Sequence, residues 1–174
     1  MNDVVVQVAD AEAARALGRA LAGVLCAGDL VVLTGPLGAG KTTLTQGLGE
    51  GLGVRGQVAS PTFIIARVHP SLVGGPALVH VDAYRLGSLE ELDALDLDES
   101  LEDSVTVVEW GEGLAEVLSE DRLEVTIARP HGAQGGDVDP LEADAGPRDV
   151  TVRAVGARWA GLDLASALAP VLGG

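Results

Sequence analysis

The segment GPLGAGKT, residues 35–42, has residue types and a spacing that could bind the phosphates of a nucleotide. It fits the pattern GxxxxGK[ST], in which glycines let the backbone turn so that successive N–H groups point at phosphate oxygens. A helix that follows the loop would add its positive N-terminal end, and the Thr42 hydroxyl can ligate Mg²⁺. Lys41 is the only lysine among eleven lysine and arginine residues. Its compact ammonium suits a tight ring of N–H groups better than a planar guanidinium does.

Two carboxylates are candidates for the groups that a phosphate loop needs opposite it, to hold a metal ion and orient the attacking group. Asp82 ends the segment ALVHVD, and Glu109 follows SVTVV. Both segments are predicted strands, and open α/β sheets bind ligands at the carboxyl ends of their strands. The simpler interpretation is an ordinary turn carboxylate at each position, with Asp82 bonded to Arg85. Two acids at equivalent strand ends, in a chain with a phosphate loop, favour the functional interpretation.

Three further features are less specific. Residues Ser60-Pro61-Thr62-Phe63 fit either a switch-like segment, whose hydroxyl senses a terminal phosphate, or a proline turn before a strand. Trp110 is typical of packing in the core or at its rim. The three histidines, at positions 69, 80 and 131, lack the spacing of metal ligands, so no zinc or iron site is predicted.

The elements that would position these residues alternate between strands and helices. The apolar run from Leu30 to Thr34 is typical of a strand buried on both faces, and a helix over residues 41–52 follows the glycine loop. Asp10 is a candidate N-cap for a helix that extends to about Cys26. The other predicted strands span 3–8, 63–68, 77–82, 104–108, 123–128 and 149–155, and the other predicted helices span about 88–95, 112–118 and 162–169.

This order of elements predicts one α/β domain over residues 1–174, a P-loop NTPase-like three-layer sandwich with a mixed, partly parallel central sheet. The strands at 63–68 and 77–82 are predicted to pair as a hairpin through a turn at 70–76, which makes the sheet mixed. Residues 129–147 are rich in Gly, Pro and Asp, and this composition predicts a flexible acidic loop.

The composition limits the partners and the compartment. A formal net charge of −15 is poorly suited to holding a nucleic-acid backbone, so any contact with RNA is expected to be indirect. The N-terminus lacks a basic segment before its apolar residues, and no stretch approaches the length of a membrane span, so neither secretion nor membrane insertion is expected. The single cysteine, Cys26, is expected to be a small buried thiol, which favours a cytoplasmic setting.

Four motifs in a fixed order, GPLGAGKTT, SPTF, HVDAYRL and VVEW, resemble the TsaE family, and the resemblance covers roughly residues 4–128. Members of that family are small ATPases of bacterial tRNA threonylcarbamoyladenosine biosynthesis. The resemblance implies that the chain binds ATP and Mg²⁺ and hydrolyses ATP slowly without partners. It also implies action on the complex of TsaD and TsaB, so that tRNA is met only through that complex.

The resemblance further implies roles for individual residues, by matching motif positions. Asp82 would orient water or contact the γ-phosphate, acting in catalysis with Lys41, while Thr42 and Glu109 would ligate Mg²⁺. Of the nucleotide contacts, Ala11 and Gly146 would lie near the adenine. The full set implied to contact ATP is Ala11, Leu37, Gly38, Ala39, Gly40, Lys41, Thr42, Thr43, Asp82 and Gly146.

Three alternative functions remain open to comparison. A small-molecule or nucleotide kinase also uses a phosphate loop, but such enzymes need several cationic groups, often on a lid, and Arg55, Arg67 and Arg85 are scattered. A GTP-dependent switch normally carries a guanine-reading lysine in an NKxD-like motif, and this chain has no second lysine. A nucleotide-sensing module with little turnover overlaps with an ATPase that is slow alone, so turnover with and without partners separates these two.

Overall fold

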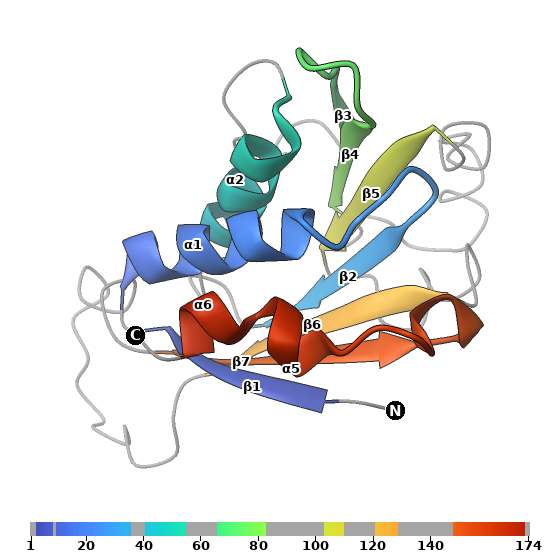
Figure 1. The fold of residues 1–174 in the computed structure, drawn as a ribbon. Coiled ribbons are helices and arrows are strands. Elements are labelled where there is room, and N and C mark those ends of the chain that lie inside the picture. Colours follow the sequence, from blue (N-terminus) through green and yellow to red (C-terminus); the bar gives the residue numbers. More distant parts are fainter. Residues whose placement is uncertain are drawn as a thin grey trace.

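A computed structural model describes residues 3–8, 10–35, 41–54, 66–82, 103–109, 121–128 and 148–172 (Figure 1). The strands are β1 (Asp3–Val8), β2 (Leu30–Thr34), β3 (Ala66–His69), β4 (Ala77–Asp82), β5 (Ser104–Glu109), β6 (Arg122–Ala128) and β7 (Arg148–Val155). The helices are α1 (Ala11–Ala22), α2 (Lys41–Leu52), the 3₁₀ helix η3 (Ala157–Trp159), α5 (Leu164–Ala167) and α6 (Ala169–Leu172).

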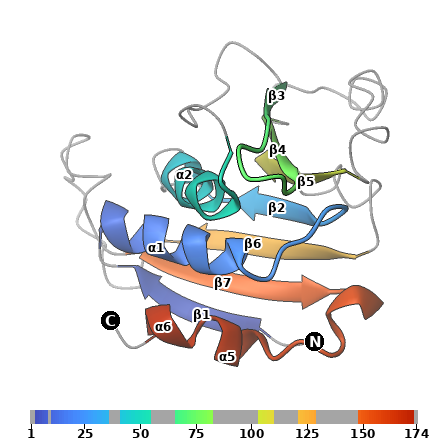
Figure 2. The same cartoon turned by 45° about the horizontal axis from the view of Figure 1, so that its top comes forward.

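All seven strands belong to one sheet in the order β1-β7-β6-β2-β5-β4-β3, which Figure 2 shows from bottom to top. The central strands β6, β2, β5 and β4 are parallel, whereas β7 pairs antiparallel with β6 and with β1, and β3 pairs antiparallel with β4. The predicted α/β class, the mixed sheet and the hairpin are therefore confirmed.

The burial of β2 and β5 in the core accounts for their runs of apolar residues. Every residue of β5 is buried, and so are the first four of β2, because both faces of these strands are covered. On one face, strand side chains pack against α1 and α2, and the end of the chain from Trp159 to Leu168 joins the same cluster. Figure 1 shows α1, α5 and α6 together over this face. The helices predicted at 88–95 and 112–118, and the loop at 129–147, lie outside the described residues.

Helix α1 begins as predicted and ends earlier than predicted. Its N-cap is Asp10, whose Oδ1 accepts a hydrogen bond of 2.9 Å from the N–H of Ala13. The helix stops at Ala22 instead of near Cys26, because the N–H groups of residues 23–25 bond to carbonyls three residues back instead of four. The N–H of Cys26 then donates to Oδ2 of Asp29. Cys26 consequently lies in the following loop and is exposed, so its predicted burial is wrong.

Other element boundaries differ by small amounts. β3 ends one residue beyond the predicted strand, at His69, and its predicted start lies outside the described residues. β6 and β7 each begin one residue early, and β5 includes Glu109. The single helix predicted at 162–169 is two short helices, α5 and α6, capped at Asp163 and interrupted at Leu168. Pro170 lies in the first turn of α6, where its missing N–H costs no helical hydrogen bond.

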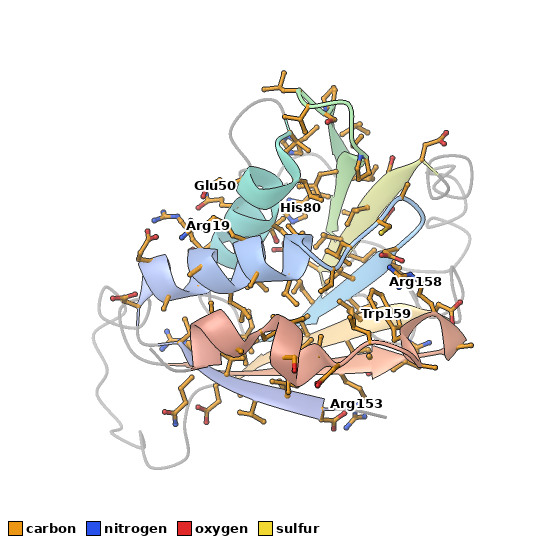
Figure 3. The ribbon with its side chains drawn as sticks, in the orientation of Figure 1. Arg19, Glu50, His80, Arg153, Arg158 and Trp159 are labelled. Carbon is orange, nitrogen blue, oxygen red and sulfur yellow. The ribbon has the colours of Figure 1, made fainter. Side chains whose placement is uncertain are left out.

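An ion pair between buried Asp29 and exposed Arg158 lies at the sheet edge opposite the carboxyl ends of the central strands. Asp29 is 5% exposed and precedes β2, and its carboxylate accepts bonds of 3.2 Å from both Nε and Nη2 of Arg158. The guanidinium also lies over the ring of Trp159, with Cζ 4.4 Å from the ring centroid (Figure 3). Asp29 thus ties the loop after α1 to the segment after β7.

Asp29→Ala is expected to lower the free energy of unfolding by about 2–3 kcal/mol, because it leaves the N–H of Cys26 and the Arg158 guanidinium without their charged acceptor. Urea denaturation followed by far-UV circular dichroism measures the change. The control is Asp3→Ala, which breaks the exposed pair of Asp3 and Arg153 and is expected to change stability little. Equal losses in the two variants would contradict a special role for the Asp29 pair.

Candidate nucleotide site

The carboxyl ends of β2, β5 and β4 meet at one edge of the sheet. The parallel register pairs Leu33 of β2 with Glu109 of β5, and Glu109 in turn with Asp82 of β4. Neighbouring strands lie about 4.8 Å apart, so the backbones of these two acidic residues are immediate neighbours. The register thus places the two acidic positions side by side at the ends of adjacent strands. The structure therefore brings together the two acids that the sequence predicts.

The segment that matches the phosphate-loop pattern connects β2 to α2 at this edge. Thr34 ends β2, Gly35 is buried, and Lys41 is the first residue of α2. Thr42 and Thr43 follow in the first turn, where backbone N–H groups lack partners within the helix and can receive an anion. Leu37, Gly38, Ala39 and Gly40 lie outside the described residues. The predicted order of strand, loop and helix is confirmed.

Helix α2 is held in place by an unusually close contact with α1. A Cβ atom on Gly18 would lie 2.7 Å from the backbone N of Leu48, and one on Gly47 would lie 2.7 Å from Cα of Arg15. Two glycines thus let the helix backbones touch. At the surface, Arg19 bridges the helices with contacts of 2.9 Å to Glu12 and to Glu50 (Figure 3). The hydrogen bond that Arg19 donates to Glu12, and next the one that it donates to Glu50, raises the pKa of Arg19.

A buried histidine lies beside Glu109. His80 of β4 is 0% exposed and Glu109 is 4% exposed, and Nε2 of His80 lies 3.4 Å from Oε1 of Glu109. Figure 3 shows His80 between α2 and the strands. The sequence interpretation missed this residue because it tested histidines for metal-ligand spacing. The available signal was its position two residues before Asp82, which places both on the same face of a strand.

The other end of the sheet contributes one more predicted position, Ala11, to the same edge. β6 runs parallel to β2, so the antiparallel partners reverse direction and bring the start of β7 and the end of β1 to this edge. Arg148 is paired with Val8 and is buried, and Ala11 begins α1 just beyond Val8. Gly146 lies outside the described residues, as do Thr62 and Trp110. The ligand contacts assigned to Ala11 and Gly146 stay predictions.

The fold and this edge define an α/β protein of the P-loop class. A sequence model described as "Threonylcarbamoyl adenosine biosynthesis protein TsaE" matches residues 8–135. The chain therefore belongs to the TsaE family.

Individual relatives agree with this family assignment. The chain is 63% identical over 151 residues to the tRNA threonylcarbamoyladenosine biosynthesis protein TsaE of Streptomyces coelicolor, covering 86% of this chain and 96% of that protein. It is 37% identical to the protein of the same name from Bacillus subtilis, covering 85% and 84% of the two chains. Among solved structures, Bacillus subtilis YdiB matches with a TM-score of 0.66 and 29% identity over 98% of this chain and 94% of that one.

Within the part of the chain that the structure describes, every helix is too short or too polar to cross a bilayer.

Proposed function

We propose that the chain is the ATP-binding, Mg²⁺-dependent ATPase component of tRNA threonylcarbamoyladenosine biosynthesis, acting in the cytoplasm on the complex of TsaD and TsaB. The observation that carries this proposal is the strand register at the sheet edge. It makes Glu109 the neighbour both of Asp82 and of the strand that leads to the phosphate loop. The names of the relatives support the tRNA pathway.

The residues at the edge fit a magnesium ion. Mg²⁺ takes oxygen ligands, often one or two carboxylates together with phosphate oxygens. The carboxylate of Glu109 is buried, and its Oε1 has no hydrogen-bond partner among the described residues, so an acceptor is available. Thr42 is the second residue of α2, which begins at the same edge, and would supply a hydroxyl oxygen. When bound, the ion would neutralise charge on the outer phosphates.

The remaining roles belong to side chains and backbone groups of this chain. The N–H groups at the start of α2 and the loop before it would hold the phosphates, with Lys41 adding its charge. Asp82 would accept a hydrogen bond from the attacking water and so orient it. Ala11 and Gly146 would contact the adenine. The net charge of −15 agrees with a tRNA contact made only through TsaD and TsaB.

The proposal is tested by phosphate release from ATP, measured for this chain alone and with TsaD and TsaB. We expect slow turnover alone and stimulation by the partners. Absence of stimulation would contradict the assigned pathway role. A kinase would transfer the γ-phosphate to a small molecule, so labelled ATP that yields a phosphorylated metabolite instead of inorganic phosphate would favour that alternative.

Replacement of each strand-end acid by alanine is expected to impair a different function, nucleotide binding for Glu109 and hydrolysis for Asp82. Glu109→Ala should weaken Mg²⁺-dependent nucleotide binding, whereas Asp82→Ala should bind ATP and lower hydrolysis by about 100-fold or more, because it removes the group that orients water. Calorimetric titration and phosphate release measure the two effects separately. Asp103→Ala, an exposed acid just before the opposite end of β5, is the control and should retain both. Normal hydrolysis by Asp82→Ala would exclude its proposed role.

A further inference from the structure

The pair formed by His80 and Glu109 is unusual because both side chains are buried and the distance between them is long for a hydrogen bond. Nε2 of His80 lies 3.4 Å from Oε1 of Glu109, longer than an ordinary hydrogen bond of about 2.7–3.2 Å. Neither ring nitrogen of His80 has a hydrogen-bond partner among the described residues, and the same holds for Oε1 of Glu109. Hydrogen bonds at catalytic sites are often long without ligand and tighten when it binds.

On strands β2 and β5, the residues beside this pair are apolar. The strand neighbours of Glu109 and His80 on β2 and β5 are Leu33 and Val107, which are both fully buried. A carboxylate in such a place is costly unless a donor or a cation faces it. Among the described residues, His80 is the group at ion-pair distance from the Glu109 carboxylate. The imidazole also has no competing partner there that would turn it away.

We propose that His80 is a positioning residue, which donates from Nε2 to Glu109 and so holds that carboxylate in the orientation needed to ligate Mg²⁺. The inference rests on the proposed function, because it assigns Glu109 to the metal. His80 and Asp82 lie two residues apart on β4, and the strand register pairs Asp82 with Glu109. One strand thus supplies both the group that fixes the metal ligand and the group proposed to orient water.

Partners of metal-ligating carboxylates influence metal affinity strongly, and their replacement typically costs about 10–100-fold. The expected change therefore concerns the Mg²⁺ concentration that nucleotide binding requires, and not the affinity for nucleotide without metal. If His80 only filled the core, its replacement would not change the Mg²⁺ requirement separately from the metal-free affinity. The separation distinguishes a positioning role from a packing role.

The test uses three substitutions at position 80 in the full chain. His80→Gln keeps an N–H near the place of Nε2, whereas His80→Asn offers one only near the place of Nδ1, and His80→Leu fills a similar volume without a donor. The probe is a non-hydrolysable ATP analogue, and calorimetry gives its affinity without metal and the Mg²⁺ midpoint of binding. Phosphate release as a function of Mg²⁺ is measured in parallel.

We expect His80→Asn and His80→Leu to raise the Mg²⁺ midpoint by about tenfold or more, with metal-free affinity unchanged, and His80→Gln to restore most of the loss. The inference is overturned if Gln and Asn behave alike, or if metal-free affinity falls in proportion. Should His80→Leu fail to fold, the two amide variants still decide the question. If the unaltered protein shows no Mg²⁺-dependent binding, the proposed function itself fails, which is a different result from a normal midpoint in His80→Asn.

Discussion

Lys41→Ala is expected to remove detectable ATP binding and to lower phosphate release by at least about 100-fold. The lysine is the first residue of α2, so under the proposed function its charge would add to the N–H groups that hold the phosphates. In a protein with a net charge of −15, phosphate binding depends on such a local concentration of donors. Calorimetric titration with an ATP analogue and phosphate release with TsaD and TsaB measure the two losses.

Two further variants separate the geometry of the lysine from its charge. Lys41→Arg keeps the charge but is expected to fail almost as badly, because a planar guanidinium does not replace a compact ammonium within a ring of N–H groups. Arg153→Ala removes one positive charge from an exposed position on β7 and is expected to leave turnover unchanged. Full activity of Lys41→Arg would show that net local charge, and not the ammonium geometry, is what the loop requires.

The sequence predicts those elements whose residue types match their burial. It does not predict features that depend on pairing between distant segments. The apolar runs of β2 and β5 indicate strands because both faces are covered, and the Asp10 cap indicates where α1 starts. The strand order depends on contacts between distant segments such as β1 and β7, which no local pattern reports. The predicted end of α1 was too late, because the N–H groups of residues 23–25 bond three residues back and that of Cys26 bonds to Asp29.

The candidate site shows the same division. The positions of Asp82 and Glu109 at strand ends follow from the sequence, but their adjacency requires β4 next to β5 in one register. A shift of one residue would move either side chain to the other face of the sheet. His80 was not predicted as a site residue for the same reason, because its proposed role depends on a contact with a neighbouring strand. Sequence motifs therefore predicted the candidate site residues, and the sheet register shows which of their positions are adjacent.

Gly47→Ala is expected to destabilise the protein by at least about 3 kcal/mol, because the added methyl overlaps backbone atoms of α1 that cannot rotate away. The new Cβ would lie 2.7 Å from both C and Cα of Arg15. Alanine favours a helix over glycine by about 1 kcal/mol, so the packing conflict outweighs the gain in helix propensity. Thermal and urea unfolding measure the loss. Gly161→Ala, which has no atom within 4 Å of its added Cβ, should change stability by less than about 0.5 kcal/mol.

The effect of Gly47→Ala on nucleotide binding follows from the position of Gly47 in the helix that begins at Lys41. Relieving the overlap requires α2 to move away from α1, and α2 carries the first-turn N–H groups and Thr42 with it. Reacting groups need placement to within about 1 Å, so the molecules that stay folded should also bind ATP more weakly. Measurements well below the unfolding transition isolate this effect. Nucleotide affinity equal to that of the unaltered protein would show that the loop holds its geometry independently of the contact between the two helices.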